Sequence, residues 1–341
     1  MAYADALSLA RLWLLSGGRP HIQLSALEPL LWRDGSLGTS DLVRGLTQMG
    51  FEVSITTNGS LLKRHAFQLK EAGLDLLRIS WHTTNPSLFN EISGGGNYAE
   101  FERGIEEAAK AGLNISFNRI LLRGRTNDLH KQLAFVIRHG LRLKLYNMYW
   151  TPELKGVYDD FYQDWRPVVR EHVLPLTNRI ERLHAGTGRA RLRFHLAPGG
   201  FVEVKLGEKL HRSEVPCSTC PHQSRCLEQF GDYVRVEPDL SIYFCYLRRD
   251  FGFPCGDLLG STTPDYVGFK RRLFDRLGNL TEQFLRSSSL SYNVVPFCNF
   301  NCFVPGTKIS WCLMTPGTYS FPKPKHRDEG VARTQELVTI T

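Results

Sequence analysis

The first half of the chain alternates short apolar runs with longer segments in which apolar residues recur every three or four positions. A short apolar run is typical of a buried strand, and the longer spacing is typical of an amphipathic helix. The pattern predicts strands over residues 21–25, 51–55, 76–80, 113–120 and 141–146, and helices over residues 3–15, 40–49, 60–72, 98–111 and 128–138. This order requires a parallel sheet with helices outside it, and it places any chemistry at the C-terminal ends of the strands.

The second half has a different pattern. Residues 151–185 carry apolar residues at helical spacing, and residues 191–195 and 201–205 predict a hairpin. A helix over residues 266–285 and a short β-rich run, Leu290 to Phe297, follow. We divide the chain into residues 1–185, an α/β domain; residues 186–288, a smaller second domain; and residues 289–341, which contain the last strand and the loop that follows it.

Composition narrows the class of protein. Hydrophobic residues make up 42% of the chain, which is enough for a sizeable core. The net charge of +8 suits an acidic or phosphorylated substrate, although solubility alone also explains it. The Lys and Arg residues are scattered, so nucleic acid is not an expected partner. We see no signal peptide and no apolar run of about twenty residues, and therefore expect a cytoplasmic protein that does not enter a membrane.

Three cysteines lie on one loop after the β-rich run. Cys298 and Cys302 are followed by Cys312, and in a cytoplasmic protein such thiols favour metal ligation over disulfides. Three thiolates can ligate three irons of a [4Fe–4S] cluster and leave the fourth iron open. A disulfide or three unrelated thiols is the alternative that this pattern alone leaves open.

This loop resembles that of the radical S-adenosylmethionine (SAM) superfamily, in the branch of the GTP 3',8-cyclases of molybdenum cofactor synthesis. That loop usually reads C-x3-C-x-aromatic-C. Here Cys298 and Cys302 keep the first spacing, Pro305 occupies the usual third position, and Ser310-Trp311-Cys312 restores the ending after an insertion. The resemblance implies a partial (β/α)6 TIM-like barrel, a SAM-binding [4Fe–4S] cluster on Cys298, Cys302 and Cys312, and Trp311 beside the cofactor.

Other motifs of the superfamily follow at the predicted strand ends. Glu28-Pro29 resembles the end of its G-G-E-P motif with both glycines replaced, and Thr56-Thr57-Asn58-Gly59 is identical to its T-T-N-G. Ser80 fits the serine of its S-L-D motif, and Asn118 matches an asparagine near SAM. The resemblance implies a SAM-binding set of Glu28, Thr57, Asn58, Ser80 and Asn118. An ordinary tight turn is the alternative for Asn58-Gly59.

His82 replaces the acid of that S-L-D motif. It is the candidate catalytic residue, either as an acid or base toward the substrate or, in the plainer interpretation, as a polar loop residue.

A second group of cysteines lies in the smaller domain. Cys217, Cys220 and Cys245 resemble the ligands of the second cluster of the GTP cyclases, and Cys226 is an additional thiol. The resemblance implies an auxiliary [4Fe–4S] cluster in a twitch/SPASM-like domain, and Cys226 would complete four-thiolate ligation. A structural zinc site is the alternative.

The order of the motifs is unusual. In the superfamily the cluster strand comes first, whereas here it comes last. Joining Thr341 to Met1 restores the usual order. We therefore expect a circularly permuted chain with its termini close in space and with residues 289–341 supplying the displaced first strand.

The resemblance implies an enzyme, a lyase or an oxidoreductase similar to GTP 3',8-cyclase. It would cleave SAM reductively to a 5'-deoxyadenosyl radical and abstract hydrogen from a small metabolite, a nucleoside, sugar or similar compound, in a biosynthetic pathway. A reducing electron donor is the implied partner.

Phe297 and His21 stand where the cyclases bind triphosphate with Arg and Lys, so GTP itself is in doubt. Arg123, Arg142 and Lys144, expected at the barrel mouth, leave an anionic substrate open. The alternatives are a peptide-modifying maturase with an auxiliary cluster and a non-catalytic iron–sulfur or zinc protein.

Overall fold

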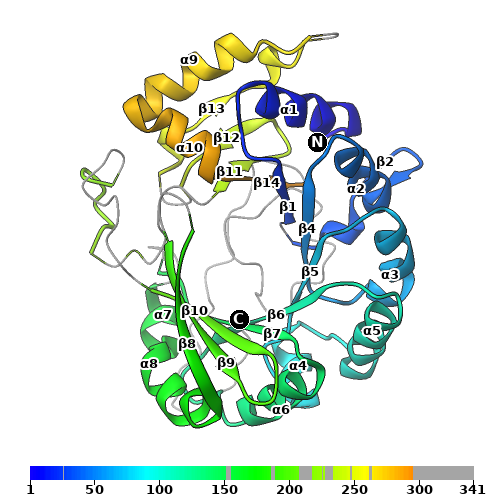
Figure 1. Ribbon diagram of the computed structural model, residues 1–341, viewed down its shortest axis with the longest axis vertical. Coiled ribbons are helices and arrows are strands. Elements are labelled where there is room, and N and C mark those ends of the chain that lie inside the picture. The colour runs from blue at the N-terminus through cyan, green and yellow to red at the C-terminus, as the bar shows by residue number, and fades with distance from the viewer. Residues whose placement is uncertain are drawn as a thin grey trace, which may run out of the picture.

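The architecture is a single curved sheet with helices on its outer side. A computed structural model of the protein describes residues 1–25, 27–150, 155–185, 189–206, 217–224, 226, 233–245, 248–260 and 263–294. Twelve of the described strands form one sheet in the order β13-β12-β11-β14-β1-β4-β5-β6-β7-β10-β9-β8. In Figure 1 this sheet curves into an open ring, and helices α1 to α6 surround its convex side.

The first half of the chain builds most of the ring. Its strands in the large sheet are β1 (His21–Ser25), β4 (Glu52–Thr57), β5 (Leu76–Ser80), β6 (Ile115–Leu121) and β7 (Arg142–Asn147). Its helices are α1 (Tyr3–Leu15), α2 (Thr39–Gln48), α3 (Leu62–Glu71), α4 (Pro86–Ile92), α5 (Tyr98–Lys110) and α6 (Leu129–His139). A two-residue pair, β2 (Arg33–Asp34) and β3 (Leu37–Gly38), forms a separate small sheet. The predicted alternation of strand and helix is confirmed, with element ends shifted by one or two residues in most cases.

A late strand completes the parallel series. Strand β14 (Ser289–Asn293) pairs in parallel with β1, and β1, β4, β5, β6 and β7 continue the parallel pairing in that order. These six strands with outer helices form the partial TIM-like barrel that the sequence predicts. β14 therefore occupies the position of a first barrel strand although it is the last described strand of the chain.

The two faces of this sheet have opposite character. Alternate residues of each strand, such as Ile22 on β1, Leu77 on β5 and Leu143 on β7, are fully buried and belong to the core. On β14 the outer residue Tyr292 donates a hydrogen bond to the carbonyl oxygen of Ala6 on α1, at 3.0 Å. Since side chains alternate along a strand, the concave face carries the remaining, mostly polar residues. The apolar core thus lies between sheet and helices, and the inside of the ring is polar.

The segment over residues 151–185 is only partly helical. Helices α7 (Lys155–Phe161) and α8 (Trp165–Val168) form, but β8 (Thr177–Ala185) is a strand paired along its length with β9 (Arg189–Leu196). The prediction of a helix to residue 185 is wrong there. The helical turns end at Leu176, and the residues after it pair with β9 to complete an antiparallel ladder.

The predicted hairpin forms and extends the barrel sheet. β9 pairs antiparallel with β10 (Phe201–Lys205), and β10 pairs in parallel with β7. At the other edge, β11 (Tyr233–Val236) pairs in parallel with β14 and leads through antiparallel pairs to β12 (Ser241–Tyr243) and β13 (Phe253–Pro254). Helices α9 (Tyr266–Leu277) and α10 (Thr281–Ser287) cover this end. The strands predicted for the second domain therefore join the first domain's sheet, and the division at residues 185 and 288 stays a prediction.

Two further sequence predictions depend on residues at the chain's end. The position of β14 beside β1 agrees with a displaced first strand. The expected proximity of Met1 to Thr341 involves residues outside the described ranges, so the circular permutation stays a prediction. Within the described ranges, no helix has the length and apolar character that crossing a membrane would require.

Candidate functional site

Glu28 ties together the loops that follow β1 and β4. Its carboxylate accepts hydrogen bonds from the Thr57 hydroxyl at 2.8 Å, the Asn58 amide at 2.8 Å and the Leu30 amide at 3.0 Å. The side chain is 3% exposed, and burial raises its pKa to about 7 even though these hydrogen bonds lower it. Three of the residues predicted to bind SAM are thus brought together. In this arrangement the carboxylate is occupied by donors of its own chain, and Glu28 fixes the shape of both loops.

The turn after β4 is held by its own side chains. Thr57 accepts a hydrogen bond from the Gly59 amide at 3.0 Å, and the Asn58 side chain accepts one from the Ser60 amide at 2.9 Å. Gly59 has a φ of +84°, and a Cβ there would lie 2.8 Å from the ring of Phe101. Only glycine fits this position without strain, which explains the Asn-Gly pair.

Ser80, the last residue of β5, and Asn118, in the middle of β6, are neighbours. They are register partners on the concave face. Asn118 is 9% exposed, and its Oδ1 has no hydrogen-bond partner within the described part of the chain. A buried acceptor of this kind is normally satisfied by a donor, such as a ligand's ammonium or hydroxyl group. The residues at this edge therefore fit a polar, partly cationic cofactor such as SAM.

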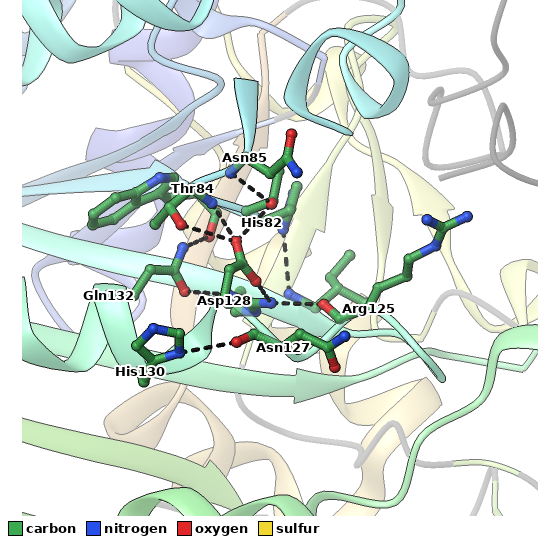
Figure 2. A network of polar contacts seen from close by, with 12 residues as sticks. His82, Thr84, Asn85, Arg125, Asn127, Asp128, His130 and Gln132 are labelled. Carbon is green, nitrogen blue, oxygen red and sulfur yellow. Dashed lines mark hydrogen bonds and ion pairs between the residues drawn. The ribbon is translucent and has the colours of Figure 1, made fainter. Parts of the chain in front are cut away.

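His82 follows directly after these strand ends. Its Nδ1 accepts a hydrogen bond from the Ile120 amide at 3.2 Å, as Figure 2 shows. Burial, and secondarily the charge of Arg119, lower its pKa to about 4. The ring is thus neutral at pH 7, with the proton on Nε2 and the Nδ1 lone pair engaged. This geometry suits a hydrogen-bond donor better than a general base.

We expect His82→Gln to reduce the acid sensitivity of folding. Because the pKa of His82 is about 4 in the folded protein and 6.5 in its reference state, the unfolded chain binds more protons between these pH values, and stability falls on acidification. For this partly buried residue the loss is roughly 2–3 kcal/mol. Urea unfolding at pH 7.5 and pH 5 measures it. An equal pH dependence in wild type and His82→Gln would contradict the assignment, and His130→Gln, at an exposed histidine, is the control.

A buried charge network holds the loops after β5 and β6. Arg119 on β6 is 0% exposed, and its Nη2 contacts Asp128 Oδ1 at 2.6 Å. Asp128 Oδ2 in turn accepts from the hydroxyl of Thr83 at 2.6 Å and from the amide of Thr84. Arg119 also donates to the side chain of Gln132 at 2.7 Å, so the network joins two loops and α6 (Figure 2).

Sequence reasoning missed Arg119 and Asp128. An arginine in the middle of an apolar strand was the available signal, because a charge there requires a buried partner.

The prediction that Arg142 lies at the barrel mouth is wrong. Arg142 is the first residue of β7 and therefore lies at the opposite end of that strand from the barrel mouth.

The cysteines of the second group lie in turns of the described chain. The Cys220 amide donates to the Cys217 carbonyl at 3.1 Å, and the Cys226 amide donates to the His222 carbonyl at 3.0 Å. Within the described ranges, no three His, Cys, Asp or Glu side chains are grouped to hold a metal ion. The auxiliary cluster on Cys217, Cys220, Cys226 and Cys245 therefore stays a prediction. Cys298, Cys302, Trp311 and Cys312 lie outside the described residues.

Known proteins resemble this chain over much of its length. Residues 4–136 match the model of the radical SAM superfamily. A "Probable GTP 3',8-cyclase" of Sulfurisphaera tokodaii is 38% identical over 241 residues, which are 70% of this chain and 69% of that protein. Another of Pyrococcus abyssi is 27% identical over 237 residues, 68% of this chain and 71% of that protein.

Solved structures give a weaker likeness. The crystal structure of Streptococcus suis SuiB bound to S-adenosylmethionine is 16% identical, with a TM-score of 0.37, and the match covers 43% of this chain and 33% of SuiB. The Sulfurisphaera tokodaii relative, 38% identical over 69% of its own length, and the match of residues 4–136 to the family model show the family. The chain belongs to the radical SAM superfamily, among the relatives of the GTP 3',8-cyclases.

Proposed function

We propose that this protein cleaves SAM reductively at a [4Fe–4S] cluster and abstracts a hydrogen atom from a small metabolite, such as a nucleoside or sugar, in a biosynthetic pathway. Membership in the radical SAM superfamily supports the use of SAM. The observation that carries the proposal is the buried Asn118 Oδ1, which has no partner in the described chain and lies beside Ser80, the last residue of β5.

Residues of the barrel strands and residues of the last cysteine loop would together hold the cofactor and the cluster. Ser80 and Asn118 would contact SAM from the strand ends, and the loops fixed by Glu28 would enclose its polar part. Cys298, Cys302 and Cys312 would ligate the cluster. When bound, cluster and SAM would supply the 5'-deoxyadenosyl radical that removes the substrate hydrogen.

The chain's own residues would position the reactants. The polar concave face would orient a hydrophilic substrate, while the helices cover the convex side of the sheet. His82 would offer the Nε2 proton as a fixed donor, because the Ile120 amide holds the other ring nitrogen. The proposal also includes an external electron donor, a cytoplasmic location and an auxiliary cluster on Cys217, Cys220, Cys226 and Cys245.

Anaerobic reconstitution with iron and sulfide tests it directly. After dithionite reduction with SAM, we expect 5'-deoxyadenosine from the wild type and none from Cys312→Ala, because the third cluster ligand is lost. Cys255→Ala is the matched control. That thiol is buried, donates to the Leu240 carbonyl at 2.8 Å and has its pKa raised to about 12, so it should be inert. Iron bound through the second cysteine group without 5'-deoxyadenosine would favour a non-catalytic metal protein.

A further inference from the structure

Two arginines share one row of the concave face. Arg78 on β5 is the register partner of Ser116 on β6, and Ser116 is the register partner of Arg142 on β7. The opposite faces of β5 and β7 carry the buried Leu77 and Leu143, so both arginines lie on the inner side. Adjacent strands are about 4.8 Å apart, which places the two arginine backbones about 10 Å apart. Only the small side chain of Ser116 lies between them in this row.

Each of these half-buried arginines has one buried nitrogen atom without an acceptor. Arg78 Nη1 and Arg142 Nε are buried without a hydrogen-bond acceptor, and neither residue forms an ion pair, within the part of the chain that the structure describes. Arg142 does lie over the ring of Phe201, at 5.1 Å. The nearby carboxylate of Glu203 is already bound by Arg193 at 2.9 and 2.7 Å. This part of the concave face therefore has excess positive charge, which an anion would neutralise.

The surroundings agree with this excess. Burial lowers the pKa of Arg142, and the negative charge of Glu203 raises it. The positive charges of the neighbouring arginines lower it further; these are Arg78, Arg193 and Arg191. His21, at the start of β1, has a buried Nδ1 without a partner in the described chain. Its pKa is lowered to about 4 by burial and by the charges of Arg78 and Arg19. A third strand thus presents a neutral polar group near Arg78.

We propose that Arg78 and Arg142, with Ser116 between them and His21 nearby, form a subsite for a single phosphate group carried by the substrate. A phosphate offers several oxygens, which match two guanidinium groups and a hydroxyl. The inference rests on the proposed function and adds the substrate class, a small phosphorylated metabolite.

The position of the row relates this subsite to the cofactor. Arg78 and Ser116 precede Ser80 and Asn118 by two residues on the same strands. Two residues of a strand span about 7 Å, so the phosphate row lies about 7 Å below the row of Ser80 and Asn118. A substrate anchored by phosphate would present carbon atoms a few bonds from phosphorus at the level of the SAM site. Sugar phosphates and nucleoside monophosphates have this length.

Phosphate binding to the protein without iron or SAM tests the subsite. Calorimetric titration with inorganic phosphate should give saturable binding, and Arg78→Gln or Arg142→Gln should weaken it at least about tenfold, since a charged hydrogen bond is lost. Arg103→Gln, at an exposed arginine of α5, should bind phosphate like the wild type. Neither subsite variant should unfold more easily than the wild type in phosphate-free buffer, because each removes a positive charge that forms no ion pair within the described chain.

Three results would overturn the inference. The first is the absence of saturable phosphate binding, and the second is unchanged phosphate binding in both variants. The third is that sugar phosphates and nucleoside monophosphates bind no more tightly than inorganic phosphate, which would indicate a site for the free anion. The test is independent of radical chemistry. Formation of 5'-deoxyadenosine without phosphate binding would leave the proposed function intact and remove only this inference.

Discussion

Replacing Arg119 with alanine is expected to lower the free energy of unfolding by about 3 kcal/mol, because it leaves the partly buried carboxylate of Asp128 without its counterion. Asp128 would lose the 2.6 Å contact with Arg119, and Gln132 would lose a donor at 2.7 Å. The loops after β5 and β6 would also lose the charge that joins them. Chemical denaturation monitored by circular dichroism measures the change.

An exposed pair supplies the control for this prediction. Arg103 contacts Glu100 on the surface of α5, where its side chain is 52% exposed, and solvent screens such pairs. Arg103→Ala should therefore change stability by less than about 1 kcal/mol. If Arg119→Ala and Arg103→Ala had equal effects, the Arg119–Asp128 pair would not hold the loops as we describe.

Asn118→Ala is expected to weaken SAM binding by about 10- to 100-fold, the loss of one hydrogen bond to a charged group. The Asn118 Oδ1 is buried without a donor in the described chain, so its removal should not lower the stability of the protein without cofactor. Equilibrium binding to the anaerobically reconstituted protein, together with thermal unfolding without SAM, separates these two effects.

Ser116→Ala provides the comparison on the same strand. Ser116 lies on the same face of β6 as Asn118 but two residues earlier, so its loss should leave SAM affinity unchanged. Equal SAM affinity in wild type and Asn118→Ala would exclude Asn118 as a cofactor contact. Equal losses in both variants would indicate a general distortion of β6.

Sequence reasoning found the barrel because each strand is bounded by turn-forming or polar residues. The strands over residues 21–25 and 76–80 were predicted with the observed ends. β8 was missed because Ile180 and its neighbours carry no strong apolar alternation, and its pairing with β9 supplies what the local sequence does not. Pairing between distant strands is a tertiary effect that local periodicity does not contain.

The sequence predicted some residues of the candidate site and missed others, because some of them come together only through strand pairing. Motifs at strand ends located Glu28 and Thr57, because parallel strands bring their C-terminal ends to one edge. Asn118 was located by a motif in the middle of β6. The motif predicted that Glu28 binds SAM, whereas its hydrogen bonds show that the carboxylate holds the loops after β1 and β4. Arg78 and Arg142 are 64 positions apart in the sequence, and only the register through Ser116 shows that they share a row.

The place of β14 also governs how the protein can be synthesised. Ser25 on β1 hydrogen-bonds Asn293 on β14 across 268 residues, so the centre of the sheet closes only after nearly the whole described chain has left the ribosome. Until then β1 and β11 each present an open edge to other nascent chains. At ordinary translation rates of roughly 5–20 residues per second this exposure lasts many seconds. The centre of the barrel therefore closes late in synthesis, and chaperone protection of the open edges before that point would favour the protein's yield.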